Sequence, residues 1–468
     1  MITRKEADSI GTMEVPMKAY YGVQTLRAKK NFHITGRPLH PEFIKNLVRI
    51  KKAAAYTNMT AHILDEKIGN AIVKACDEII EGKLHSQFIV DAIQGGAGTS
   101  ANMNANEVIA NRAIEILGGE KGDYTIVHPN DHVNMAQSTN DVIPSAGKLT
   151  ILALLPGLLE QLERLHKALR DKSIEFDDVV KMGRTQLQDA VPIRLGQSFE
   201  AYAAVIERDI RRIRSLDSEI KVLNIGATAV GTAINVNPVY LFHIIRNVNL
   251  VCGTDCIQAE DLFDATQNLD GFVHTSAALR VCAVNLSKIC NDLRLLSSGP
   301  KAGLGEINLP PKQNGSSIMP GKINPVIPEV VSQVAYNVIG NDVTVTMAAE
   351  AGQLELNAFE PVIFYKIFES IDTLRGAVET LIDNCILGIT ANRERCRALV
   401  ESSAALATAL CPALGYKKSA EIAKKCNRTG IPVRQIVLEE GLLPEEELDR
   451  YLSLVDMTQA GHPVDYKL

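Results

Sequence analysis

The residues most able to do chemistry stand together in the segment 315–325, which reads Gly-Ser-Ser-Ile-Met-Pro-Gly-Lys-Ile-Asn-Pro. Its reactive side chains are the hydroxyls of Ser316 and Ser317, the ammonium of Lys322 and the amide of Asn324. Hydrogen-bond donors and a cation gathered in this way stabilise negative charge that develops during a reaction. The segment is therefore suited to carbanion chemistry next to a carboxylate.

Glycines and prolines should shape this segment as a loop with a flexible tip and a fixed base. Gly315 and Gly321 allow backbone conformations that other residues avoid, and Pro325 pushes the residue before it into an extended conformation. Pro328 suits the first turn of a helix, which we expect to run to about residue 340. The N-terminus of that helix would attract anions.

The alternative interpretation is a solvated Gly/Ser connection followed by an ordinary helix. However, the stretch 297–325 shows little periodicity, and connections of this length in compact proteins are usually functional or disordered. Buried-type residues on both sides argue against disorder. We therefore interpret the segment as a functional loop.

A glycine turn leads into a predicted helix at residues 94–107. There Thr99 follows Gly-Ala-Gly, so that its hydroxyl and several backbone amides would face outward. A Thr99 or Ser100 in this position is equally expected as a helix N-cap. The glycines resemble a phosphate-binding loop only weakly, because no Lys follows at the required spacing, and we expect no nucleotide.

Residues 132–141 form a second polar stretch, dense in small side chains that hydrogen-bond. It includes Ser138, Thr139 and Asn140, just before the first long helix is expected to begin. Polar groups beside a buried element need partners. The alternative to a functional site is local capping, with Asp141 near the N-terminus of that helix.

A third polar stretch, residues 181–192, is interpreted as a turn between two helical segments. It contains Thr185 and Gln186. The alternative to a functional turn is a purely structural connection. We expect Arg184 and Asp189 to form a structural ion pair within it.

Helical periodicity dominates the rest of the chain. Five leucines alternate steps of three and four residues, which places them on one face of a long helix: Leu155, Leu158, Leu162, Leu165 and Leu169. Similar patterns cover residues 197–222, 259–296 and 328–379. With aromatic residues at 5% and no Trp, these helices should pack closely as a bundle. Several are apolar around much of their circumference, which indicates burial in an oligomer.

The pattern predicts three consecutive domains in a mainly α-helical chain of 468 residues. Residues 1–139 mix mostly short helices with glycine-rich turns, residues 140–395 form a central domain with a long helix bundle, and residues 396–468 form a small helical domain. In this last part the short helical segments are stopped by Gly430 and Gly441.

Composition argues against several classes of function. The formal charge of -6 and the pI of about 6.0 give no bulk attraction to nucleic acid. No segment has the composition of a membrane span, and the N-terminus lacks the apolar core of a signal peptide, so we expect a cytoplasmic protein. The 9 cysteines and 10 histidines are scattered, and we expect neither a disulfide framework nor a zinc site.

Four motifs together identify the chain as a member of the aspartase/fumarase superfamily. They occupy residues 96–99 (Gly-Ala-Gly-Thr), 137–141 (Gln-Ser-Thr-Asn-Asp), 183–190 (Gly-Arg-Thr-Gln-Leu-Gln-Asp-Ala) and 315–325. The aspartase branch is the most similar, since fumarases typically carry Ser-Ser-Asn where this chain has Ser-Thr-Asn. The resemblance implies a mainly helical homotetramer of three-domain chains, with a central bundle shared by four chains and active sites drawn from three of them.

The resemblance also implies an activity, the reversible anti elimination of ammonia from L-aspartate to give fumarate, with neither a metal nor another cofactor. Ser316 would be the general base, activated by loop amides and by Lys322. Four donors would hold the aci-carboxylate formed at the β-carboxylate: Thr99, Ser138, Thr139 and Ser317. Thr185, Lys322 and Asn324 would bind the α-carboxylate, and Asn140 would orient the amino group.

Gln186 departs from the superfamily pattern, because many members, fumarases above all, have His at this position. A hydroxide leaving group needs an acid to protonate it, whereas an ammonium group already carries its proton. Gln186 therefore favours ammonia loss, and a class II fumarate hydratase is the alternative enzyme. A non-catalytic scaffold, as in lens crystallins of the superfamily, is an alternative of another class. Intact Ser316, Lys322 and Asn324 argue against it.

Overall fold

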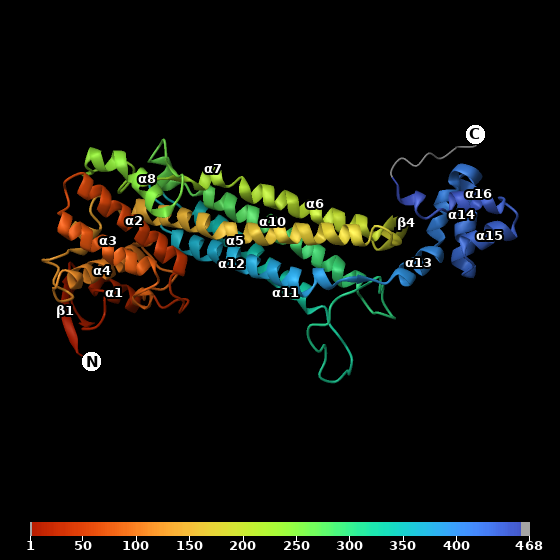
Figure 1. Ribbon diagram of the computed structural model, residues 1–468, viewed down its shortest axis with the longest axis horizontal. Coiled ribbons are helices and arrows are strands. Elements are labelled where there is room, and N and C mark those ends of the chain that lie inside the picture. The colour runs from red at the N-terminus through yellow and green to blue at the C-terminus, as the bar shows by residue number, and fades with distance from the viewer. Residues whose placement is uncertain (1, 460–468) are drawn as a thin grey trace. The chain divides into compact units, whose positions relative to one another are not determined.

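Helices dominate the computed structural model, which describes residues 2–459 (Figure 1). The longer helices are α1 (Val23–Asn31), α2 (Pro41–Thr60), α3 (Glu66–Ile80), α4 (Thr99–Ile116), α5 (Thr139–Glu175), α6 (Leu195–Arg214), α8 (Pro238–Cys252), α10 (Asp270–Leu296), α11 (Val326–Glu350), α12 (Glu360–Asn384), α13 (Arg393–Glu401) and α14 (Cys411–Thr429). The shorter ones are α7 (Asp217–Ile220), α9 (Asp264–Gln267), α15 (Val433–Glu439) and α16 (Glu445–Tyr451). The expected mainly α-helical fold class is confirmed.

The strands of the described residues pair two by two. Three pairs are antiparallel: β1 (Thr3–Asp8) with β2 (Gly11–Pro16), β3 (Val180–Thr185) with β4 (Gln188–Arg194), and β7 (Ile307–Asn308) with β8 (Thr390–Ala391). The fourth pair is parallel and joins β5 (Val222–Leu223) to β6 (Ile257–Gln258). Each sheet is a small two-stranded contact within a mainly helical protein.

Two compact units make up the chain. Unit 1 contains Met1–Leu159, Arg211–Ala283 and Tyr336–Leu374, and unit 2 contains Glu160–Ile210, Val284–Ala335 and Arg375–Leu468. Segments of α5, α6, α10, α11 and α12 belong to each unit. The division into three consecutive domains stays a prediction, because these units group segments that are distant in sequence.

The leucine stripe predicted for a long helix is confirmed in α5. All five leucines are buried, with exposed fractions of at most 3%: Leu155, Leu158, Leu162, Leu165 and Leu169. Burying a leucine side chain contributes about 2 kcal/mol. The 3.6-residue period places this gain on one face, which explains why so long a helix is stable.

Helix α5 also corrects the expectation that no segment has the composition of a membrane span. By length and composition alone it is sufficient to cross a membrane. However, 61% of its most apolar window is buried inside the protein. Core helices meet the same criteria, because burial against protein and burial in lipid select the same apolar side chains.

The predicted helix at residues 328–340 is longer than expected at both ends, since α11 begins at Val326 and ends at Glu350. A methyl group added at Gly340 would meet nothing within 4 Å. Glycine in a helix interior costs only about 1 kcal/mol relative to alanine. Burial of Val345 beyond it contributes more than that, so tertiary packing overrides the glycine signal.

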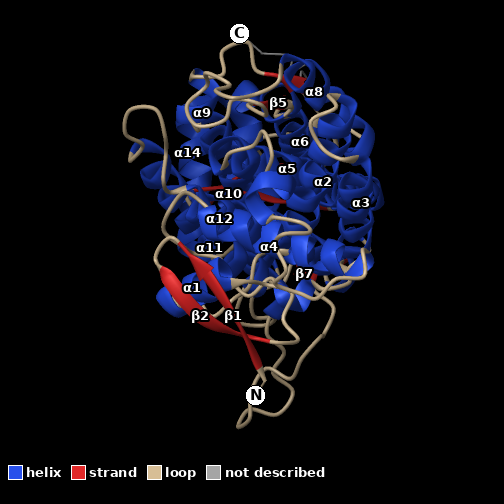
Figure 2. Ribbon diagram, turned by 90° about the vertical axis from the view of Figure 1, so that its left-hand side faces the viewer, coloured by secondary structure: helices blue, strands red, loops and turns tan. Residues whose placement is uncertain are grey.

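In unit 1 the hairpin β1–β2 lies beside α1 (Figure 2), and α2 packs against α3 and α8. Helix α2 begins after His40, whose ring accepts a hydrogen bond from the backbone N–H of Glu42 and which is followed by a proline. Leu47, Val48 and Ile50 of α2 are fully buried. These contacts fix the elements that hold the first group of candidate residues.

In unit 2 the helices α14, α15 and α16 cluster together (Figure 1) around a shared apolar core. Seven members of that core are fully buried: Met182, Val400, Leu410, Val433, Ile436, Val437 and Leu448. Helix α14 ends at Gly430, and a second turn follows α15 at Gly441, both with left-handed backbone angles. The short glycine-stopped helices predicted for this part of the chain are confirmed.

Candidate active site

The glycine turn before α4 has a left-handed backbone at three residues, Gly96, Ala97 and Gly98, with φ of 85°, 54° and 86°. Gly98 is the N-cap of α4 and has no side chain to cap it, while Oε1 of Gln94 accepts from the backbone N–H of Ala101 in the first turn at 2.8 Å. The capping alternative for Thr99 and Ser100 is therefore wrong. The Thr99 hydroxyl is exposed and donates to the carbonyl oxygen of Gly96 at 2.7 Å, so its oxygen keeps lone pairs that face solvent.

An asparagine connects this turn to the second polar stretch. The Asn102 amide in the first turn of α4 donates to Oγ1 of Thr139 at 3.3 Å and to Oδ1 of Asn134 at 3.2 Å. Asn134 in turn donates to the carbonyl oxygen of Gln137 at 3.1 Å. The structure thus brings the helix that carries Thr99 into direct contact with the Ser138–Asn140 segment.

Ser138, Thr139 and Asn140 lie half-buried at the start of α5, and Asp141 holds the first of them. The buried Asp141 carboxylate accepts from the backbone N–H groups of Ser138 at 3.0 Å and of Gly226 and Thr228 at 3.1 Å. Burial raises the pKa of Asp141 to about 6, against these hydrogen bonds, which lower it. The capping role weighed for Asp141 is confirmed.

The Asn140 amide donates to the carbonyl oxygen of Ala229 at 2.7 Å, and its backbone N–H donates to Oγ of Ser138 at 3.2 Å. One amide hydrogen is therefore used to orient the side chain. The Oδ1 atom keeps its two lone pairs for an ammonium group.

Lys51 is a further residue of this network that the sequence did not reveal. It lies on α2, is 0% exposed, and donates through Nζ to Oδ1 of Asn134 at 2.8 Å. Burial lowers the pKa of Lys51 to about 7, although the Asp141 carboxylate raises it. The only local signal is a charged residue within an apolar run, Ile-Lys-Lys-Ala-Ala-Ala, and its partner is distant in sequence.

Thr185 and Gln186 lie in unit 2, at the tip of a β-hairpin. The predicted turn between helical segments is therefore wrong, because β3 and β4 flank it. Gln186 and Leu187 form the turn with left-handed φ angles of 53° and 62°, as two-residue hairpin turns require. Both are exposed, so the hairpin presents Thr185 and Gln186 to solvent.

The predicted ion pair between Arg184 and Asp189 is also wrong. Arg184 Nη1 lies 3.0 Å from both carboxylate oxygens of Glu306, and Lys181 Nζ lies 3.4 Å from the same side chain. Asp189 instead accepts from the Ser403 hydroxyl at 2.7 Å. Glu306 is 0% exposed, and a carboxylate removed from water needs cations more than an exposed one does.

The loop 315–325 closes at its base through backbone contacts. Gly315 N–H donates to the carbonyl oxygen of Lys322 at 2.8 Å, and the Asn324 amide donates to the carbonyl oxygen of Gly315 at 2.8 Å. A methyl group at Gly315 would lie 2.5 Å from the Lys322 oxygen, so only glycine fits there. The expected fixed base of the loop is confirmed.

Within the loop, Oγ of Ser316 accepts from the backbone N–H groups of Ile318 at 3.2 Å and Met319 at 3.0 Å. Two amide donors directed at one hydroxyl oxygen stabilise negative charge on it. Ser317 and Lys322 are exposed. Lys322 forms no ion pair with any residue in the range 2–459, so its ammonium is available to an anion.

The predicted residues thus lie in three local groups. The first, in unit 1, contains Thr99, Ser138, Thr139 and Asn140. The second is the hairpin tip with Thr185 and Gln186, and the third is the loop with Ser316, Ser317, Lys322 and Asn324, both in unit 2. Each group presents hydroxyl, amide or ammonium donors to solvent, which suits a dianionic ligand.

Comparison with known proteins decides the family. Residues 11–340 match the family described as Lyase, and residues 406–459 match the one described as Fumarase C C-terminus. An aspartate ammonia-lyase from Bacillus subtilis (strain 168) is 53% identical over 458 residues, 98% of this chain and 96% of that protein. The chain belongs to the aspartate ammonia-lyase family.

Solved structures of the wider superfamily share the fold. A fumarate lyase:delta crystallin from Brucella melitensis matches with a TM-score of 0.95 and 51% identity, over 98% of this chain and 100% of that one. A class II fumarase from Schistosoma mansoni matches with a TM-score of 0.94 and 34% identity, over the same shares. The superfamily identified from the four motifs is therefore confirmed, as is the aspartase branch within it.

No three side chains of His, Cys, Asp or Glu gather as a metal site within the described part of this aspartate ammonia-lyase family member. All nine cysteines lie in that part as free thiols, and most are buried. Burial raises the pKa of Cys256 and of Cys426, which makes both poor nucleophiles. The candidate chemistry rests on hydroxyls, amides and one ammonium.

Proposed function

We infer that this chain catalyses the reversible anti elimination of ammonia from L-aspartate, giving fumarate. The observation that carries the inference is the 53% identity to an aspartate ammonia-lyase over 98% of the chain. The donors of the three groups are of the kind this reaction needs. They are neutral hydroxyls and amides with one cation, suited to a substrate whose charge becomes more negative during proton removal.

We propose Ser316 as the general base. Removing a proton from the β-carbon of aspartate is difficult, because it places a second negative charge beside a carboxylate. The amides of Ile318 and Met319 already donate to the Ser316 oxygen, which lowers the energy of an alkoxide there. Lys322, exposed in the same loop, would supply the cation.

The aci-carboxylate would be held by hydroxyl and amide donors: Thr99, Ser138, Thr139 and Ser317. Support comes from the hydrogen bonds that hold Thr139 and Ser138 in place. Asn102 donates to the Thr139 hydroxyl and Asp141 accepts from the Ser138 N–H, so the geometry is fixed before any ligand arrives. Preorganised donors need no rearrangement as charge develops. The α-carboxylate would be bound by Thr185, Lys322 and Asn324.

Ammonia would leave from an ammonium group held by Oδ1 of Asn140. Because that group carries its own proton, no acid is needed at the hairpin tip, and Gln186 is sufficient as a neutral hydrogen-bonding neighbour. A fumarate hydratase is the second candidate, supported by the likeness to a class II fumarase. The lower identity of 34% and Gln186 favour ammonia loss.

An ultraviolet assay of fumarate formation separates the two enzymes. L-aspartate should be converted by the purified protein, and L-malate should not. Turnover of L-malate with no turnover of L-aspartate would establish the hydratase instead. Undetectable turnover of every dicarboxylate tried would support a non-catalytic scaffold.

We also propose a homotetramer in the cytoplasm whose active sites each draw on three chains. In support, many large apolar side chains on α10 and α11 are exposed: Val284, Leu295, Val330, Tyr336, Val343 and Met347. Exposed apolar surface of this extent indicates a partner surface.

Shared sites can be tested by mixing inactive subunits. Ser316→Ala removes the loop group and Thr139→Val the first group, so each variant alone should be inactive. If Ser316 and Thr139 of one active site come from different chains, some sites in a co-refolded mixture will contain both wild-type residues. Activity will then return. Mixtures that stay inactive would show that one chain supplies both residues.

A further inference from the structure

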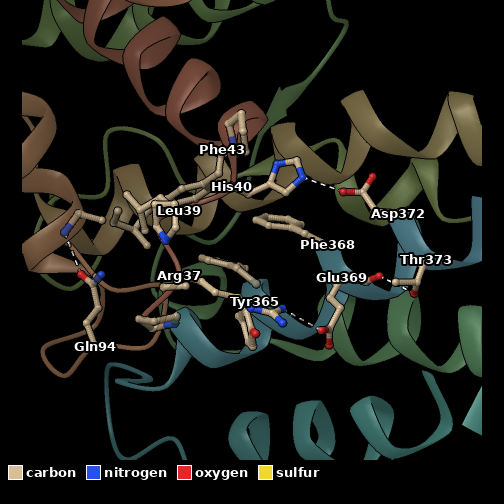
Figure 3. A pocket seen from close by; sticks show the side chains of 18 residues that line it. Arg37, Leu39, His40, Phe43, Gln94, Tyr365, Phe368, Glu369, Asp372 and Thr373 are labelled. Atoms are coloured by element: carbon tan, nitrogen blue, oxygen red, sulfur yellow. Dashed lines mark hydrogen bonds and ion pairs between the residues drawn. The ribbon is translucent and has the colours of Figure 1, made fainter. Parts of the chain in front are cut away.

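A pocket in unit 1 (Figure 3) is lined by none of the side chains assigned to the dicarboxylate. Its volume is about 420 Å³, within the range of small-molecule sites. The start of α2, the segment before it, the glycine turn and the first turns of α12 line it. The proposed reaction uses none of the side chains on its floor or rim.

The floor of the pocket is aromatic. The rings of Phe364 and Phe368 stack with centroids 5.9 Å apart and an interplanar angle of 12°. Phe43 lies against both, at 5.7 Å and 5.9 Å. Only 3–4% of each of these side chains is exposed, so the packed rings give the pocket a rigid apolar floor against which an aromatic ring can lie.

The rim carries charges of both signs, as Figure 3 shows. Arg37 lies 3.5 Å from Glu369, with 64% of its side chain exposed, and His40 Nε2 lies 2.9 Å from Asp372 Oδ2. Because His40 Nδ1 accepts from the backbone N–H of Glu42, Nε2 carries the hydrogen and donates to Asp372. The guanidinium and the carboxylates both keep capacity for further hydrogen bonds.

We propose that this pocket binds a zwitterionic aromatic α-amino acid, with its ring on the phenylalanine floor, its carboxylate on Arg37 and its ammonium on Asp372. A ligand with only one charge could engage only one of the two rim pairs. A small aliphatic amino acid would cover less of the apolar floor and fill less of the 420 Å³. Charge complementarity and the aromatic floor therefore select the same class of ligand.

The inner wall connects the pocket to the proposed site. It is formed by Gly98, Ala101 and Ile143, next to Thr99 and close to Asn140 in the sequence. Gln94, also on the wall, accepts from the Ala101 N–H at 2.8 Å and so ties the glycine turn to α4. An occupant would contact α4 and α5 at residues next to both substrate-binding segments.

Isothermal titration of the full-length protein with L-phenylalanine tests the proposal, with succinate present in excess to fill the dicarboxylate site. We expect saturable binding that succinate does not displace. Three probes each lack one feature: 3-phenylpropanoate has no ammonium, 2-phenylethylamine no carboxylate and L-alanine no ring. Each should bind at least about tenfold more weakly, the value of one lost charge-assisted hydrogen bond or ring contact.

Two exposed variants assign the charges. Arg37→Gln should weaken L-phenylalanine and 3-phenylpropanoate alike, and Asp372→Asn, which still accepts from His40, should weaken L-phenylalanine and 2-phenylethylamine. Lys45→Gln removes a cation of α2 that pairs with Glu42 and should change nothing. Absence of saturation in the low millimolar range, competition by succinate, or unchanged affinity in both rim variants would overturn the proposal. A pocket covered by a second copy of the chain would give the first of these results.

Discussion

At the scale of single residues, the proposed chemistry depends on one hydroxyl. Oγ of Ser316 accepts from two backbone amides, and the residue is half-buried whereas residues 317–323 are exposed. Without such donors the hydroxyl of a serine is too weakly acidic to lose its proton, so no alkoxide would be present to act as the base. The loop therefore supplies the electrostatics and the side chain supplies the oxygen.

Ser316→Ala should lower kcat for L-aspartate at least about 10³-fold, because general-base catalysis contributes about this factor. The melting temperature and the oligomeric mass should stay unchanged, since the loop contributes no buried core. Ser218→Ala, at an exposed serine of α7, is the matched control. A near-normal kcat in the Ser316 variant would refute the base assignment.

Asp141 gives a prediction on pH. Burial raises the pKa of its carboxyl in the folded protein to about 6, from 3.8. Between these values the folded protein holds a proton that the unfolded chain has released, so the free energy of unfolding falls as pH rises. The effect is fully present below pH 3.8 and is lost by about pH 6.

Asp141→Asn removes this titration. The melting temperature of the wild type minus that of the variant should therefore decrease from about pH 4 to about pH 6. Differential scanning calorimetry at fixed protein concentration measures this difference. A difference that increases with pH over the same window would show that the native hydrogen bonds outweigh burial and lower the pKa.

At the scale of elements, the loop 315–325 works because its base is closed. The contact between Gly315 N–H and the Lys322 oxygen brings the two ends of the reactive segment together. The buried Glu306, which holds Arg184 and Lys181, ties the residues just before the loop to the hairpin β3–β4. The hairpin is thus anchored to the segment that leads into the loop.

Gly315→Ala should open the loop base, because its methyl group would lie 2.5 Å from the Lys322 oxygen. We expect kcat to fall about 10²-fold or more through misplacement of Ser316. Gly321→Ala, whose methyl group would meet nothing within 4 Å, is the control. It should cost only about 1 kcal/mol of local backbone strain. Equal effects of the two substitutions on kcat would contradict this account.

At the scale of the whole molecule, the chain exposes apolar side chains that a single copy does not cover. Met347 on α11 is 67% exposed, and Tyr336 on the same helix is 58% exposed. An isolated soluble chain gains nothing from such a surface. The proposed assembly would bury it and, by sharing sites, would make activity depend on association.

Met347→Glu should therefore reduce both the oligomeric mass and the activity, because burying an unpaired carboxylate in an apolar interface is strongly unfavourable. Light scattering coupled to size-exclusion chromatography measures the mass. Ile10→Glu, at an exposed residue of the β1–β2 turn, should change neither. An unchanged mass in the Met347 variant would place that surface outside any interface.

The sequence by itself determined the helical class, the leucine seam of α5 and the residue types of the three candidate groups. These features depend on local periodicity and on the chemistry of single side chains, both of which can be read along the chain. The motif density also identified the superfamily. The glycine stops near the C-terminus were readable for the same local reason.

Only the tertiary structure decided which partners the buried charges have. Arg184 contacts Glu306 and not Asp189, and the buried Lys51 donates to Asn134. Helix α11 continues through Gly340. Each of these outcomes depends on segments far apart in sequence. The cost of removing a charge from water, or the gain from packing a helix face, is fixed only when the surroundings have been assembled. The conformational preferences of single residues are weaker than these energies, so the sequence could not predict these contacts or the end of α11.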